Sequence, residues 1–432
     1  MNISESFGCN EKGHLTIGGA DAVELAKEYS TPLYVLDEQE IRKNCRGFVN
    51  SMNEYYGGNG LVLYASKAFS CKEMYRIVMS EGMGADVVSG GEIYTALKAG
   101  FPMDKIYFHG NNKTYDELVF AIESGVGRIV VDNIFELETL NSLAAKYGKK
   151  IDVLLRIKPG VNAHTHDFVR TGQIDSKFGF ALETGEAMEA IKAANASVGI
   201  NLVGIHCHIG SQIFDISPFE YAAKVMLEFI EKIEKDEGIE IVELNLGGGF
   251  GIKYLDSDNP APFQNYMERV SKVIKSECAA REIKTPYILI EPGRAIVGAA
   301  GATLYTIGAV KEIPDIRTYV TVDGGMNDNP RYILYKSEYE AAVADKFSQE
   351  RDFTVTIAGK CCESGDLIQE NTKIQKPEIG DTLAVFSTGA YNYSMASNYN
   401  RIPRPATVMV NNGESRVIIK RETYEDIIRN DV

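Results

Sequence analysis

The sequence predicts an α/β fold, in which a parallel (β/α)8 TIM-type barrel is combined with a mostly antiparallel β domain. Between residues 61 and 291, eight short apolar, β-prone runs alternate with helical patterns. That order is typical of a parallel barrel with its helices outside. After Pro292, strand-like segments follow one another with turns between them, which indicates antiparallel pairing. A doubly wound open sheet is the alternative for the first region, because a single sequence does not give strand order.

The elements follow from local patterns in chain order. Residues 20–29 predict a short helix, residues 31–36 predict a strand, and Asp37 fits the N-cap of a helix that continues to about Met52. The eight barrel strands are expected at 61–64, 84–88, 105–109, 128–132, 151–157, 202–208, 242–246 and 287–291. Helices are expected between them, for example at 91–99, 115–123, 134–147 and 218–235. Later strands are expected at 304–310, 319–322, 353–357, 382–386, 407–410 and 416–419.

The domain boundaries follow from these elements. The N-terminal strand lies far from the first barrel strand, so we expect it to join the later strands. The expected β domain comprises residues 1–35 and 287–432, and the barrel comprises residues 36–286.

Composition narrows the class of protein. The formal net charge of −15 argues against non-specific nucleic-acid binding. No apolar stretch approaches the roughly 18 residues of a membrane span, and the first residues lack the basic and apolar regions of a signal peptide. The seven scattered cysteines are typical of reduced thiols. We therefore expect a cytoplasmic protein with no nucleic-acid or membrane partner.

Three features at the expected strand ends point to one cofactor. Lys67 ends the first apolar run, where it either extends into water or forms a Schiff base. The glycine run 247–251 either binds a phosphate or forms a tight turn. Glu291 ends the eighth run, where it meets either a protonated ring nitrogen or a basic side chain. Taken together, a Schiff-base lysine, a phosphate loop and a ring-nitrogen carboxylate describe a pyridoxal phosphate site.

Two histidine pairs suggest a rival, a metal-dependent barrel hydrolase. His206 and His208 lie on one face of the sixth strand, and His164 and His166 lie in a loop. A hydrolase of that kind would carry its pair earlier and an aspartate at strand eight, so we expect no metal. His208 would instead stack on the cofactor ring, and Ser211 would donate to its phosphate. The turn 359–366 places Cys362 beside carboxylates, which is more typical of a site than of a core.

The chain resembles the fold-type III pyridoxal phosphate-dependent decarboxylases from about residue 31 to residue 410. The resemblance is carried by motifs at residues 64–68, 86–92, 175–179, 206–212, 247–251, 291–294, 323–331, 362–366 and 389–391. It implies a head-to-tail homodimer with shared active sites, in which Cys362 and Glu363 come from the other subunit. It also implies decarboxylation of meso-2,6-diaminopimelate at its D-centre to L-lysine and CO2.

The resemblance also assigns residue roles. Lys67 would carry pyridoxal 5'-phosphate, Glu291 would face its ring nitrogen, His208 would stack on the ring, and Cys362 would be the acid. The phosphate would be surrounded by Ser211, Gly248, Gly249, Arg294 and Tyr391. The substrate's distal end would be held by Arg294, Arg331, Tyr335, Glu363 and Tyr391. Action on another amino acid, such as ornithine, and a catalytically silent relative that binds a partner protein remain alternatives.

Overall fold

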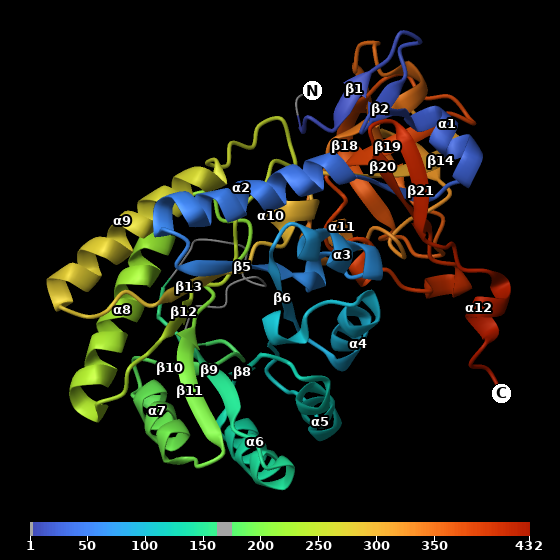
Figure 1. Ribbon diagram of the computed structural model, residues 1–432. Coiled ribbons are helices and arrows are strands. Elements are labelled where there is room, and N and C mark those ends of the chain that lie inside the picture. The colour runs from blue at the N-terminus through green and yellow to red at the C-terminus, as the bar shows by residue number, and fades with distance from the viewer. Residues whose placement is uncertain (1–2, 162–174) are drawn as a thin grey trace. The chain divides into compact units, whose positions relative to one another are not determined.

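The structure is a computed structural model that describes residues 3–161 and 175–432. The chain divides into two compact units (Figure 1). The barrel unit consists of Cys45–Gly251 and Pro260–Gly293, and the β unit consists of Met1–Asn44, Ile252–Asn259 and Arg294–Val432.

Eight parallel strands close into the predicted barrel. Their order is β5-β6-β7-β8-β9-β11-β12-β13, with β13 paired to β5. These strands are β5 (Gly60–Ala65), β6 (Gly84–Val87), β7 (Ile106–Phe108), β8 (Arg128–Val131), β9 (Ile151–Lys158), β11 (Ile200–His206), β12 (Glu243–Asn245) and β13 (Tyr287–Ile290). The two-residue β10 (Phe180–Ala181) pairs beside β9. Each predicted run became a strand because both of its faces are covered, as parallel strands require.

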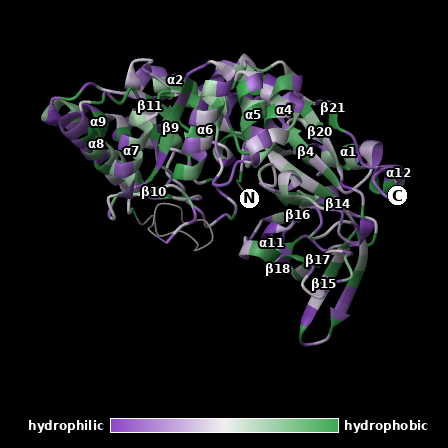
Figure 2. Cartoon of the chain, turned by 90° about the horizontal axis from the view of Figure 1, so that it is seen from below, coloured by the Kyte–Doolittle hydropathy of each residue, from purple (hydrophilic) through white to green (hydrophobic). Residues whose placement is uncertain are grey.

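Helices surround the barrel strands in Figure 1. They are α3 (Lys72–Ser80), α4 (Gly90–Ala99), α5 (Tyr115–Ser124), α6 (Ile134–Tyr147), α7 (Glu186–Ala196), α8 (Ser217–Glu237) and α9 (Phe263–Arg281). Hydrophilic and hydrophobic residues alternate along these helices in Figure 2, as expected when one side is buried. Helix α5 begins at a capping box formed by Thr114 and Glu117.

The β unit is built on β4 (Leu33–Asp37). Strand β4 pairs antiparallel with β14 (Gly301–Ile313) and parallel with β20 (Ala406–Asn411), so the prediction that the N-terminal strand joins the later β region is confirmed. The other strands are β15 (Arg317–Val322), β16 (Ala341–Val343), β17 (Phe353–Ala358), β18 (Leu367–Ile374), β19 (Thr382–Phe386) and β21 (Glu414–Ile419), with β1 (Phe7–Cys9), β2 (Leu15–Ile17) and β3 (Ala20–Asp21) in a separate sheet.

Short helices complete the β unit. They are α1 (Ala22–Tyr29), α10 (Arg294–Val297), α11 (Arg331–Tyr335) and α12 (Tyr424–Ile428). Helix α2 (Glu38–Tyr56) continues from this unit into the barrel unit. The Asp37 carboxylate accepts a hydrogen bond from the Gln39 amide at 2.9 Å, as expected of an N-cap.

The structural division differs from the expected boundary before residue 287. Strand β13 hydrogen-bonds to β12 and β5, so it is the barrel's last strand and the barrel unit continues to Gly293. Segment Ile252–Asn259 belongs with the β unit. In the described part of the chain, no helix combines the length and apolarity needed to cross a membrane.

Candidate active site

Polar side chains are buried where the barrel strands end. Six of them follow or lie near the carboxyl ends of β6, β7, β8, β9, β11 and β13: Asp86, His109, Asp132, Arg156, His206 and Glu291. The carboxyl ends of barrel strands are the usual place for catalytic residues. A group of buried charges at this end is costly unless its members satisfy one another or a ligand.

Glu291 lies at the centre of this group. One carboxylate oxygen, Oε1, accepts a hydrogen bond from Asn245 Nδ2 at 2.7 Å and lies 2.8 Å from His109 Nε2. The other, Oε2, lies 3.4 Å from His206 Nε2. Burial opposes ionisation of this carboxyl, but the two imidazoles outweigh it and hold the pKa of Glu291 well below its usual range. Glu291 is therefore an anion at neutral pH.

For His206 and Asp86, unlike Glu291, burial dominates and favours the neutral form. Burial lowers the pKa of His206 to about 3, so its imidazole is neutral at pH 7. Burial also raises the pKa of Asp86. Within the described residues, Asp86 Oδ1 and His206 Nδ1 are buried without a hydrogen-bond partner.

Lys67 lies just beyond β5, in a short 3-10 helix formed by Ser66–Ala68. Its side chain is exposed, whereas its neighbours Ser66 and Ala68 are buried. Burial is the main cause that lowers the pKa of His208, and the Lys67 charge is the next. The Lys67 charge also opposes the burial-driven rise in the pKa of Asp86. The ammonium group therefore lies within electrostatic reach of both residues.

The glycine loop, residues 247–249 after β12, has no room for side chains. A Cβ on Gly248 would lie 2.2 Å from the Glu291 carbonyl oxygen. A Cβ on Gly249, whose φ is +114°, would lie 2.6 Å from the Gly210 carbonyl oxygen. Asn245 Oδ1 accepts from the Gly247 amide at 2.9 Å, and His208 Nδ1 accepts from the Gly248 amide at 3.2 Å.

The chemistry of these residues fits pyridoxal phosphate. A bare backbone loop suits a phosphate, an ionised buried carboxylate suits a protonated ring nitrogen, and an exposed amine suits an aldehyde carbon. Ser211 is half-buried in the loop that follows β11. The barrel residues predicted for cofactor binding are thus grouped at one end of the barrel unit.

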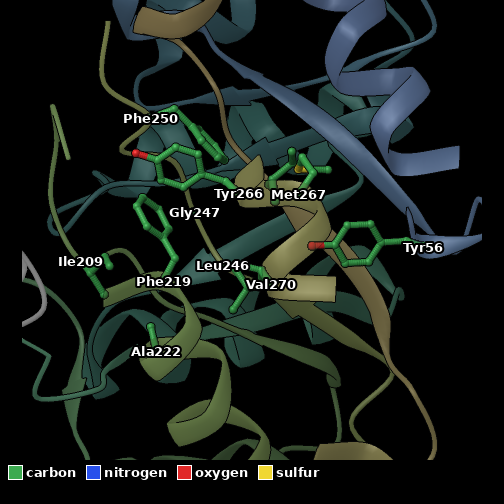
Figure 3. A pocket seen from close by; sticks show the side chains of 11 residues that line it. Tyr56, Ile209, Phe219, Ala222, Leu246, Gly247, Phe250, Tyr266, Met267 and Val270 are labelled. Atoms are coloured by element: carbon green, nitrogen blue, oxygen red, sulfur yellow. The ribbon is translucent and has the colours of Figure 1, made fainter. Parts of the chain in front are cut away.

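A cavity in the barrel unit does not share this chemistry. Leu246 and Gly247 form part of its wall, together with Ile209, Phe250 and side chains of α8 and α9 (Figure 3). Its lining is almost entirely apolar and aromatic. The Tyr266 hydroxyl in this wall already donates to the Ile213 and Phe214 carbonyls. A cavity of this kind does not suit a phosphate or an amino acid.

In the β unit, three of the predicted substrate-binding residues, Arg294, Arg331 and Tyr391, lie in a cluster of arginines and tyrosines. Arg294 donates to the Tyr254 hydroxyl, and its guanidinium lies 4.7 Å from the ring centroid of Tyr391. Arg331 is buried and donates to the Tyr339 hydroxyl at 2.8 Å and to the Ser337 hydroxyl at 3.2 Å. In the described β unit, no carboxylate pairs with Arg331.

Tyr335 ends the same short helix, α11, and is half-buried. Tyr391 is also half-buried and has a φ of +64°. Both are therefore partly accessible side chains of the β unit, as a substrate-binding role requires.

The two neighbouring cysteines of the β17–β18 turn face different surroundings. Cys361 is buried, and its Sγ lies 3.5 Å from Asn327 Oδ1. Cys362 and Glu363 are exposed, and the Cys362 amide donates to Asn400 Oδ1 at 2.8 Å. Of these two cysteines, only Cys362 is accessible to a molecule outside the chain.

Some functional residues were missed by sequence reasoning. Asp86 lies within β6 and Asn245 ends β12, each with a buried polar side chain, and a polar residue at such a position was a usable signal. Tyr254 and Tyr339 had none, because no local pattern identifies the arginines that donate to their hydroxyls, Arg294 and Arg331.

Of the two predicted histidine pairs, the structure describes only His206 and His208. His208 contacts the glycine loop, and His164 and His166 lie outside the described residues. His206 instead groups with His109 and Glu291, whose candidate ligand atoms lie within 4.8 Å of one another.

Comparison with known proteins identifies the family to which the barrel belongs. Residues 38–298 match the family model described as pyridoxal-dependent decarboxylase, pyridoxal binding domain. The barrel and its strand-end residues therefore belong to a pyridoxal phosphate-dependent decarboxylase, a carboxy-lyase.

Full-length relatives narrow the class. The chain is 51% identical to diaminopimelate decarboxylase of Bacillus subtilis (strain 168), over 98% of this chain and 96% of that protein. It is 44% identical to the Staphylococcus aureus (strain COL) enzyme, over 98% of each chain. The chain belongs to the diaminopimelate decarboxylase family.

Solved structures agree with this assignment. Diaminopimelate decarboxylase from M. jannaschii, in co-complex with L-lysine, is 37% identical with a TM-score of 0.92, covering 100% of this chain and 99% of that one. Lysine/ornithine decarboxylase from Vibrio vulnificus, complexed with putrescine, is 22% identical with a TM-score of 0.76, covering 91% and 99%. The second likeness shows the shared fold alone.

Proposed function

We propose that this chain decarboxylates meso-2,6-diaminopimelate at its D-centre, giving L-lysine and CO2 in the last step of lysine biosynthesis. The observation that carries the substrate assignment is Arg331, a buried guanidinium whose partners in the described β unit are all neutral. Such a group suits the second carboxylate of a dicarboxylic substrate. A substrate that ends in a bare amine would leave that charge uncompensated.

The barrel residues have the following proposed roles. Bound pyridoxal phosphate supplies an electron sink for the electron pair that remains when CO2 leaves. Lys67 would hold the aldehyde carbon through its amine, and Glu291 would keep a proton on the ring nitrogen. His208 would stack on the ring, and Ser211 and the backbone of Gly248 and Gly249 would bind the phosphate.

The β-unit residues are proposed to bind phosphate and substrate. Arg294 and Tyr391 would lie beside the phosphate and reach the substrate. Arg331 and Tyr335 would bind the distal carboxylate of the substrate. Glu363 faces the distal ammonium. Cys362 donates the proton that replaces the lost carboxylate, a role supported by the exposure of its thiol.

We further propose a head-to-tail homodimer in which Cys362 and Glu363 serve the partner's site. Exposed apolar side chains where α5 and α6 begin support an interface, since Tyr115 is 53% exposed and Phe135 is 78% exposed. The seven cysteines are all free thiols, which supports a reducing, cytoplasmic location.

A substrate panel tests the specificity. CO2 release from meso-diaminopimelate, L-ornithine and L-lysine is measured with the purified holoenzyme under identical conditions. We expect kcat/KM for meso-diaminopimelate to exceed that for the other two by at least a hundredfold, about 2.7 kcal/mol of discrimination. Equal turnover of ornithine would contradict the assigned role of Arg331. Loss of activity with a chelator would favour the metal-hydrolase alternative.

A further inference from the structure

Tyr254 lies at the centre of the buried arginine–tyrosine cluster of the β unit. Arg294 donates an N–H to its phenolic oxygen, and the Arg331 guanidinium lies 5.0 Å from its ring centroid. The Tyr339 hydroxyl accepts a hydrogen bond from Arg331, and the Tyr339 ring meets the Tyr254 ring edge-on, with their centroids 5.5 Å apart. Tyr254 therefore contacts both arginines, Arg294 through its hydroxyl and Arg331 through its ring.

The backbone around Tyr254 is also fixed. The Tyr254 and Leu255 amides both donate to Asp258 Oδ2, each at 2.9 Å. This turn belongs to the short segment Ile252–Asn259, which packs with the β unit although the chain on either side of it belongs to the barrel unit. The Tyr254 side chain is 6% exposed. Its position is therefore determined by its own turn and by the two guanidinium groups.

The cluster carries the positive charge that is expected of an anion-binding site. Arg294 and Arg331 are both buried, and two buried cations a ring apart repel each other unless an anion or a polar group compensates them. Burial alone would raise the pKa of Tyr254, but the two guanidinium groups outweigh it and lower that pKa. A phenol with strengthened acidity is a good hydrogen-bond donor to a carboxylate oxygen.

We propose that Tyr254 is a specificity-determining residue, which holds the guanidinium groups of Arg294 and Arg331 at the spacing that receives a substrate carboxylate. The proposal rests on the proposed function, because it concerns the distal carboxylate that remains after CO2 leaves the D-centre. Tyr254 favours the binding of amino acids that have a distal carboxylate over that of amines that lack one, and it takes no part in bond cleavage.

Two ligands isolate this effect. L-lysine keeps the distal carboxylate, whereas cadaverine has the same carbon chain and the same two amines without it. Binding of each to the wild-type and Tyr254→Phe holoenzymes is measured by calorimetry. We expect the Kd of L-lysine to rise about tenfold, which is about 1.4 kcal/mol, and the Kd of cadaverine to change less than twofold. The absorbance of the bound cofactor is expected to stay unchanged.

Tyr29→Phe is the matched control. It removes a tyrosine hydroxyl that hydrogen-bonds to Ser415 Oγ at 2.9 Å in the same unit, away from the arginines. The control is expected to bind both ligands as the wild type does. A Tyr254→Gln variant keeps an acceptor for Arg294 and is expected to bind L-lysine more tightly than Tyr254→Leu does.

Two results would overturn the proposal. One is an unchanged L-lysine affinity in Tyr254→Phe, and the other is an equal loss of affinity for L-lysine and cadaverine, which would show that Tyr254 only supports the fold. CO2 release by the wild type is a separate readout. If the wild type releases no CO2 from meso-diaminopimelate, the proposed function is refuted. If Tyr254→Phe still loses the preference for L-lysine over cadaverine, the proposed role of Tyr254 stands.

Discussion

The side-chain amide of Asn245 connects Glu291 to the glycine loop of the barrel site. Its Nδ2 donates to Glu291 and its Oδ1 accepts from the Gly247 amide, at 2.7 and 2.9 Å. The residue is completely buried. Glu291, which is proposed to face the ring nitrogen, and the glycine loop, which is proposed to bind the phosphate, are therefore both held by a single side chain.

Replacing Asn245 by alanine tests this coupling. The change leaves the Gly247 amide without its acceptor and removes one donor from Glu291, at a cost of about 1–3 kcal/mol. We expect cofactor affinity, measured by absorbance titration of the apoenzyme, to fall at least tenfold. Asn201→Ala removes an exposed amide that bonds to Asp152 in the same unit and should leave cofactor affinity unchanged.

His206 gives the barrel unit a defined sensitivity to acid. Its pKa is about 3 when folded and about 6.5 when unfolded, so between these values the unfolded chain binds the extra proton. Stability is therefore full above pH 6.5 and is lost as the pH falls, by about 1.4 kcal/mol per pH unit. Thermal unfolding at pH 7 and pH 5 should show a smaller loss of Tm in His206→Gln than in the wild type. An unaltered pH slope would mean that His206 is protonated in the folded protein.

At the scale of elements, Asp366 joins two loops of the β unit. It accepts from the Met326 amide at 2.6 Å and from the Cys361 amide at 2.7 Å. A Cβ on Gly325 or Gly359 would lie within 2.5 Å of its Oδ2. The loop that leads to Arg331 and the turn that carries Cys362 are therefore held against the same carboxylate.

Asp366→Ala should loosen that turn. Two amides, one of them buried, lose their acceptor, and we expect amide hydrogen exchange of residues 359–366 to accelerate at least tenfold. Exchange in β21, Glu414–Ile419, should not change. Asp352→Ala, at an exposed position before β17, is the matched control. Unchanged exchange in the turn would show that its own backbone hydrogen bonds are sufficient.

The elements also show which features the sequence could predict. The barrel strands were predictable because most of their residues are buried and most of the runs are apolar. Strand β18 was not predicted, because Gln369, Glu370, Asn371 and Lys373 hide the pattern. Tertiary contacts with β17 and α11 stabilise it instead.

The site was predictable where one residue carries the signal. Lys67 and Glu291 each end an apolar run with a charge, and the structure places both near the carboxyl end of the barrel. The network of Asp86, His109 and Glu291 was not predictable, because pairing between distant strands brings these residues together. Likewise, only the fold shows that Cys361 is buried and Cys362 is exposed.

At the scale of the whole molecule, the proposed dimer makes each active site depend on two chains. If Lys67 and Cys362 of one site come from different subunits, Lys67→Ala and Cys362→Ala are each inactive alone. Mixed in equal amounts, they should recover about a quarter of wild-type activity, since half of the dimers are mixed and each of those has one intact site. Activity and sedimentation are measured on the same mixture. A dimer that recovers no activity would place both residues in the same chain's site.

The central claim is that this chain uses Lys67 and pyridoxal phosphate to convert meso-diaminopimelate to L-lysine. The most direct measurement is the product formed from meso-diaminopimelate by the wild-type and Lys67→Ala proteins, followed by chiral amine analysis and CO2 release. The account predicts one L-lysine for each CO2 with the wild type and neither product with Lys67→Ala. D-lysine as the product, or equal turnover by Lys67→Ala, would contradict it.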